Sequence, residues 1–179
     1  PMTFNPRFTQ LFHADLHHYL LDAHRVDEML PDAPDIEFCF ERILQAYLPD
    51  GMREYAQYPN VTMGWMMFIG MAIAHYWDAD WTAHAEDEQK YEHLRDATDF
   101  DHMDDHICQK VLNLSIREHE SLNDIVGECA ARTNSLLRRH AEPGTPEAFQ
   151  AFVAALHELY TFGAAIELKR LGYKMVKVD

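Results

Sequence analysis

The longest run of apolar side chains in the chain lies at residues 62–77. From Met63 to Ala74 no residue carries a charged or polar side chain, so a helix here is apolar on every face, which is typical of a helix buried at the centre of a fold. A membrane span needs about 18 to 25 such residues, and this run ends at His75 and soon meets Asp78. The pattern therefore predicts a buried central helix rather than a membrane span.

Small residues are interleaved with large ones along this central helix. Gly64 and Gly70 stand among tryptophan, methionine and phenylalanine residues. A glycine inside a helix costs about 1 kcal/mol relative to alanine, so packing has to compensate for each one. We expect the small residues to let neighbouring backbones come close. The methionines favour core filling, although methionine also lines adaptable binding surfaces.

Apolar residues at steps of three and four predict further helices on both sides of the central one. A loop rich in turn-forming residues is expected at 49–60, and Gly127 is a candidate bend or close-contact point. Alternation typical of a strand is confined to residues 173–178. The expected helices cover about residues 6–30, 34–48, 79–97, 102–140 and 146–171.

Together these patterns predict an all-α protein. We expect residues 1–179 to form a single helical domain, because its length and apolar content suffice for one well-buried core. Short connections favour antiparallel neighbours, as in a bundle of five or six helices around the buried helix at about 62–77.

The net charge of the chain limits the kinds of partner that it can bind. The formal net charge is −15, which argues against nucleic acid and against an anionic membrane surface, since both require basic protein surface. The segment from Asp78 to Asp105 has eleven acidic residues against Lys90 and Arg95. We expect this segment to lie on the surface, where it is suited to dock a basic protein partner.

Cysteine usage and the start of the chain indicate the compartment. The three cysteines have no CxxC or other metal-ligand spacing, which is typical of reduced core thiols in a cytoplasmic protein. The first residues have neither the basic nor the apolar region of a secretory signal. We therefore expect a cytoplasmic protein.

Motifs for common catalytic chemistry are missing. The sequence has no GxSxG, no glycine-rich phosphate loop and no HExxH, so no catalytic residue can be assigned. The leading interpretation is a soluble binding or interaction protein that forms a homo-oligomer. Its interface would use aromatic side chains beyond those that one core needs. Tyr55, Tyr58, Trp81 and Phe100 are the candidates.

Histidine clusters raise a second possibility, because twelve histidines are many for this length. His13, His17 and His24 fall on one flank of the first helix, and His102 and His106 are four residues apart beside Asp105. Both spacings suit a metal ion. Pairs four residues apart also arise by chance in a histidine-rich chain.

A candidate ligand site lies where the predicted helix at 102–140 meets the central helix. The apolar stripe through Leu114 and Leu122 finds Glu118 on the core-facing line, with His119 beside it. Carboxylates on such lines are paired or protonated, and they cluster at functional sites. We expect Glu118 to be buried and bonded to His75, His119 or an arginine.

Asp78, three residues after His75 on the central helix, completes this set of four ligand-binding candidates. Alternatively, the four residues form a structural polar bridge, or the helix face simply reaches solvent there. If His75, Asp78, Glu118 and His119 converge on a divalent metal, the alternative function is a metal-dependent hydrolase within a helical bundle. In that case the metal activates water.

Overall fold

The computed structural model describes residues 2–175, which form eight α-helices, two short turns of other helix types and no β-strand. The predicted all-α class is confirmed, whereas a bundle of five or six helices is not. The helices are α1 (Pro6–Asp22), α2 (Pro34–Phe38), α3 (Phe40–Tyr55), α4 (Pro59–His84), α5 (Lys90–Asp96), α6 (Met103–His106), α7 (Ile116–His140) and α8 (Pro146–Arg170); η1 (Phe100–His102) and η2 (Ile107–Val111) flank α6.

Helix α4 is the predicted central helix, and every residue from Thr62 to Ala74 is buried. Helix α8 crosses it at two glycines. A Cβ atom on Gly70 would lie 2.2 Å from the carbonyl oxygen of Tyr160, and one on Gly163 would lie 2.1 Å from that of Met67. The predicted close approach of a neighbouring backbone is thus confirmed at Gly70, and only glycine leaves room for it.

Gly127, in contrast, makes no close contact. A Cβ atom there would meet nothing within 4 Å, and the residue lies exposed inside the continuous helix α7. The prediction that it marks a close-contact point was wrong.

Helix α8 is also long and apolar enough to cross a membrane by length and composition. However, 89% of its most apolar window is buried inside the fold. A core helix has this property when other helices cover all of its faces.

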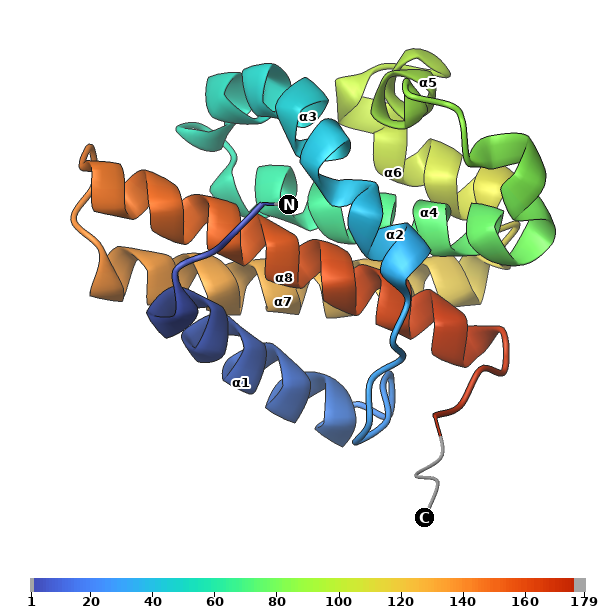
Figure 1. The fold of residues 1–179 in the computed structure, drawn as a ribbon, viewed down its shortest axis with the longest axis horizontal. Helices are drawn as coiled ribbons and strands as arrows, with labels where there is room; N and C mark the ends of the chain where they lie inside the picture. The colour runs from blue at the N-terminus through green and yellow to red at the C-terminus, as the bar shows by residue number, and fades with distance from the viewer. Residues whose placement is uncertain (1, 176–179) are drawn as a thin grey trace.

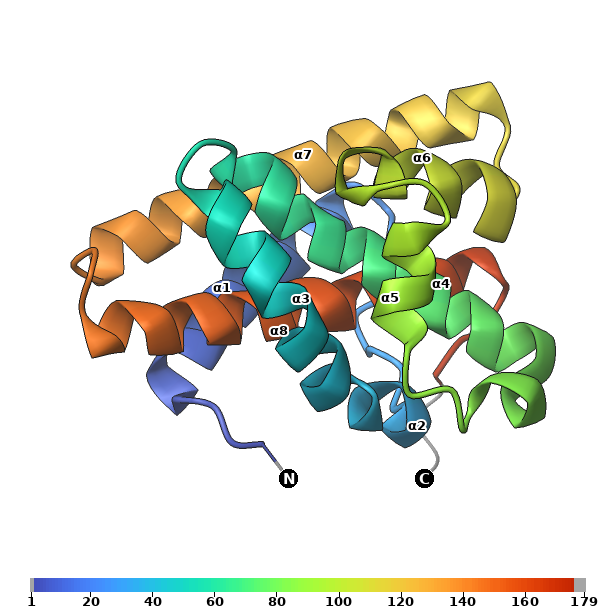
Figure 2. The same ribbon diagram turned by 90° about the horizontal axis from the view of Figure 1, so that it is seen from above.

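The remaining helices cover the α4–α8 pair from several sides (Figures 1 and 2). Helices α7 and α8 leave a shared loop and diverge, while α4 packs against both. Helix α1 packs on α7 and α8 on one side, and α3 packs on α4 on the other. Helix α5 in turn contacts α3.

A buried carboxylate ties α3 to α5. Asp50, which is 8% exposed, accepts hydrogen bonds from the hydroxyl of Tyr91 at 2.5 Å and from Nη1 of Arg95 at 3.2 Å. Burial, followed by the hydrogen bond to Asp50, raises the pKa of Tyr91, so its hydroxyl keeps the proton that it donates. This cluster fixes the distance between the two helices.

Several predicted helix ends were wrong, each for a local reason. Helix α1 stops at Asp22 because His24 adopts a positive φ of 59°. Helix α3 continues through Pro49 to Tyr55, so much of the predicted loop at 49–60 is helical. Of the strand-like residues 173–178, residues 173–175 have no regular structure, and residues 176–178 lie outside the described range.

The predicted helix at 102–140 is in fact two helices that a reversal of the chain separates. Asn113 has a φ of 53°, a conformation that asparagine tolerates better than most residues. The hydroxyl of Ser115 then caps α7 by accepting a hydrogen bond from the N–H of Glu118. Glu118 therefore belongs to the first turn of α7 rather than to the middle of a long helix.

Candidate functional site

Glu118 is exposed, so the prediction that it is buried was wrong. Its Oε1 accepts a hydrogen bond of 3.1 Å from the hydroxyl of Ser115, whose Oγ in turn accepts one from the N–H of Glu118. A serine followed three residues later by a glutamate is the sequence pattern of a helix N-terminal capping box. The position thus stabilises the start of α7.

His75 is bonded to a buried carboxylate that was not predicted from the sequence. Its Nδ1 lies 2.9 Å from Oε2 of Glu167, which is 1% exposed. Arg170 donates to both oxygens of Glu167, at 2.5 and 2.8 Å. Asp78 is exposed and accepts a hydrogen bond from the hydroxyl of Tyr173.

The four predicted residues therefore do not form one site. His75, Asp78 and Glu118 bond Glu167, Tyr173 and Ser115, respectively, and among residues 2–175 their ligand atoms do not gather with that of His119. The histidine flank on α1 also separates. Nδ1 of His13 lies 2.9 Å from the buried Glu158, Nε2 of His17 bonds the carbonyl of Asp27, and His24 lies in the turn after α1.

Two buried glutamates, Glu158 and Glu167, lie on the core helix α8. They are the two acidic residues in the run from Phe152 to Leu168, which is apolar apart from these glutamates, His157 and Thr161, and this is the signal in the sequence that would have identified them. The hydrogen bond to Glu158 raises the pKa of His13, with burial opposing it. The pairs with Glu158 and Glu167 thus give a structural role to two of the twelve histidines, His13 and His75.

A different group of ligand atoms does converge beside the reversal of the chain. Asp104 and Asp105 on α6 and His119 on α7 each place one ligand atom within 4.8 Å of the other two. Burial raises the pKa of Asp104. His102, predicted as a ligand together with His106 and Asp105, bonds Asp99 instead.

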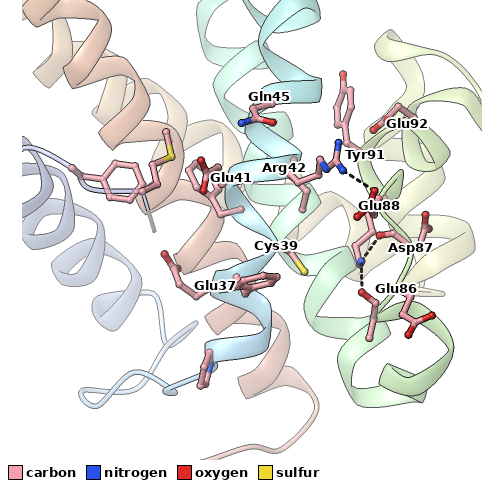
Figure 3. Close-up of a pocket in the computed structure, with 18 residues that line it drawn as sticks. Glu37, Cys39, Glu41, Arg42, Gln45, Glu86, Asp87, Glu88, Tyr91 and Glu92 are labelled. Atoms are coloured by element: carbon pink, nitrogen blue, oxygen red, sulfur yellow. Dashed lines mark hydrogen bonds and ion pairs between the residues drawn. The ribbon is translucent and has the colours of Figure 1, made fainter.

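A groove of about 930 Å³ lies between two walls (Figure 3). One wall is α2 with the start of α3, and the other is the segment that links α4 to α5 together with the first turn of α5. Its volume is within the range of small-ligand sites, about 300–1,000 Å³. We call it the acidic groove.

Acidic side chains dominate both walls of the acidic groove. Figure 3 shows that Glu37 and Glu41 lie on the α2–α3 wall and that Glu86, Asp87, Glu88 and Glu92 lie on the opposite wall. The basic residues of the lining are Arg42 and Lys90. The groove therefore carries a net negative charge.

Both basic side chains already bond to groups in the walls of the groove. Nη2 of Arg42 donates to Oε2 of Glu88 across the groove at 2.7 Å. Lys90, which is 8% exposed, donates to the backbone carbonyls of Asp87 and Ala85. Neither residue is thus available to attract an anion.

Some carboxylates of the acidic groove are bonded to other residues, and others have no ion pair among the described residues. Glu37 lies 2.6 Å from Nε2 of His157. Although partial burial opposes the change, hydrogen bonds from the N–H of Gln89 and from His93 hold the pKa of Asp87 below its ordinary value. Among residues 2–175, no ion pair involves Glu41, Glu86 or Glu92, which leaves three carboxylates for a ligand.

The acidic groove also has an apolar component. Phe38, at the end of α2, is 87% exposed, and Phe4, Pro34 and Phe40 line the same wall. Phe38 was not among the residues predicted for an interface. Phe38 lies off the apolar stripe formed by Ile36, Phe40 and Ile43. That position was the signal in the sequence that its side chain is exposed.

Most of the aromatic residues predicted for an interface are covered by other side chains, unlike Phe38. Phe100 is buried and accepts a hydrogen bond from Nε1 of Trp65 through its carbonyl. Trp81 is partly covered by Lys90 and Tyr55 by Phe152. Tyr58, at 52% exposed, is the member of this set that lies open to solvent.

Comparisons of this chain with protein families, with curated proteins and with solved structures found no match.

Proposed function

We propose that this protein is a binding module whose acidic groove takes a basic, amphipathic segment of another protein. The observation that supports the proposal best is that an exposed aromatic side chain, Phe38, lies in the same groove as three carboxylates that have no ion-pair partner within the described part of the chain. Exposed aromatic residues rimmed by polar groups mark interfaces, and aromatic anchors contribute much of the binding energy.

Charge complementarity selects the kind of occupant. Lysine and arginine side chains would meet Glu41, Glu86 and Glu92, while an apolar side chain would cover Phe38. A second copy of the chain, with a net charge of −15, would add repulsion instead. Electrostatic complementarity of this kind raises association rates and selects partners, so a basic segment is favoured.

Selection of binding peptides tests this proposal even though the partner is unidentified. A displayed library of random peptides of about 15 residues, long enough for several helical turns, is selected on the purified protein. We expect enrichment of sequences that combine lysine or arginine with leucine or an aromatic residue, and weaker binding at high salt. Enrichment of acidic sequences, or of apolar ones without basic residues, would refute the proposal.

Variants with matched charge then locate the site. The double variant Glu41→Lys/Glu86→Lys changes the groove, and Asp124→Lys/Glu142→Lys makes the same change in net charge at exposed positions elsewhere. We expect the groove variant to weaken binding of a selected peptide by about tenfold or more, equivalent to about 1.4 kcal/mol. Equal losses in both variants would mean that binding follows net charge alone.

The apolar contact needs its own variant. Because Phe38 is 87% exposed, Phe38→Ser should leave the free energy of unfolding nearly unchanged. We expect it to weaken binding of the selected peptide. Unchanged affinity would exclude Phe38 as the anchor.

A further inference from the structure

The reversal of the chain between α6 and α7 brings the start of α7 back beside two residues of α6. After α6 the backbone makes the π-helical turn η2, and the N–H of Leu112 donates to the carbonyl of Ile107. The N–H of Leu114 then bonds the carbonyl of Cys108. Turns of the π type are frequent at functional sites.

This reversal places His119 opposite two adjacent aspartates. Nε2 of His119 lies 3.6 Å from Oδ1 of Asp105, and Asp104 offers a third ligand atom in the same group. Two ligands at about 2.1 Å from a tetrahedral ion are about 3.4 Å apart. The separation between His119 and Asp105 is close to that value.

The imidazole distinguishes this group from an ordinary acidic surface. Nε2 of His119 is buried and has no hydrogen-bond partner among residues 2–175, and the histidine side chain is only 13% exposed. A buried nitrogen without a hydrogen bond is unfavourable, and a metal ion bound at its lone pair would satisfy it. The pairs His93–Asp87 and His102–Asp99, in contrast, each involve a nitrogen that is hydrogen-bonded.

We propose that Asp104, Asp105 and His119 bind one divalent transition-metal ion. One imidazole nitrogen and two carboxylates suit the borderline ions Zn²⁺ and Fe²⁺, and also Mn²⁺, which favours carboxylate ligands. Asp105 is 48% exposed on its side chain, so water can complete the coordination from that side. The ion would join α6 to the start of α7 and offset the repulsion between the two neighbouring carboxylates.

Titration of the chelator-treated protein tests the site with each metal alone as the probe. Calorimetry with Zn²⁺ and Mn²⁺ gives the stoichiometry, and the visible spectrum of bound Co²⁺ reports the ligand set. We expect one tight equivalent and a rise in the midpoint of thermal unfolding. The absence of any saturable binding at one equivalent would overturn the proposal.

Variants separate this site from the other histidines. His119→Gln and Asp105→Asn should each weaken the tight site by about tenfold or more, in line with the loss of one ligand. The control His102→Gln removes the exposed His102–Asp99 pair and should leave the affinity unchanged. Circular dichroism shows that each variant is folded. Tight binding that survives in both ligand variants, or that disappears in the control, would contradict the assignment.

Discussion

Replacing Gly70 by alanine perturbs the crossing of α4 and α8 directly. The new Cβ atom would lie 2.2 Å from the carbonyl oxygen of Tyr160 and 3.1 Å from the amide nitrogen of Ala164. An ordinary carbon–oxygen contact is about 3.3 Å or longer, so the helices must separate by about 1 Å at this point. Backbone atoms cannot move aside by rotating a side chain.

The expected loss of stability follows from two opposing effects. Overpacking in a core costs about 1–3 kcal/mol, and a backbone obstacle favours the upper end of this range. Alanine recovers about 1 kcal/mol of helix propensity. We therefore expect Gly70→Ala to lower the free energy of unfolding by about 2 kcal/mol net.

Gly127→Ala is the matched control, because its Cβ atom would meet nothing within 4 Å. This substitution should raise the free energy of unfolding by about 0.5–1 kcal/mol. Urea unfolding followed by circular dichroism measures both variants, provided that the m-values agree. The double variant Gly70→Ala/Gly163→Ala should lose less than the sum of its parts, because one separation relieves both clashes.

If Gly70→Ala is as stable as Gly127→Ala, the close crossing of α4 and α8 is wrong.

Three further predictions concern the termini of helices, buried pairs and assembly. Ser115→Ala should lower the free energy of unfolding by about 1 kcal/mol. Glu118→Leu should lower it by less than that. A large loss of stability in Glu118→Leu would contradict the exposed position of this residue. Because the hydrogen bond to Glu158 raises the pKa of His13 above its ordinary value of 6.5, the pair stabilises the fold below pH 6.5 and loses this effect as pH rises through the raised pKa. The difference in thermal midpoint between the wild type and His13→Gln should thus be larger at pH 5.5 than at pH 8.5, and a difference independent of pH would contradict the pairing. Self-association stays a prediction from the aromatic content, and light scattering at micromolar concentration that gives the monomer mass of 20.9 kDa would exclude it.

The burial of the central helix could be predicted from the composition of its own sequence. A helix from Met63 to Ala74 is apolar on every face and is stable in water only when all of its faces are buried. In the structure every residue of this stretch is buried. Gly70 inside that stretch likewise indicated a close backbone contact. Neither inference depended on which element is the partner.

The reversal before α7 could not be predicted from helical periodicity. Ile107, Val111 and Leu114 keep the spacing of a helix although the chain turns back at Asn113, between the last two of them. The decisive signals were single residues, namely Asn113 with its left-handed conformation and Ser115 three positions before Glu118. Interpreting Glu118 as an interrupted stripe gave the wrong site, while a capping box was the simpler explanation.

The acidic groove could be predicted only in part. The acidic character of residues 86–92 followed from composition, and their position on the surface follows from the cost of burying charge. Their pairing with Glu37, Glu41 and Phe38 depends on how α3 packs against α5, which the Asp50 cluster determines. Contacts between elements far apart in the sequence leave no trace in the local pattern.

Photo-crosslinking from the acidic groove tests the proposed binding mode most directly. A photoreactive phenylalanine replaces Phe38 in the groove or, as a control, Phe149 on α8, which is also exposed at 46% and is not part of the lining. Each protein is irradiated with the tightest basic peptide from the selection, and the products are measured by mass spectrometry. We predict a cross-link from position 38 that high salt suppresses, and little from position 149. Equal cross-linking from both positions, or none from position 38, would contradict a basic segment in the acidic groove.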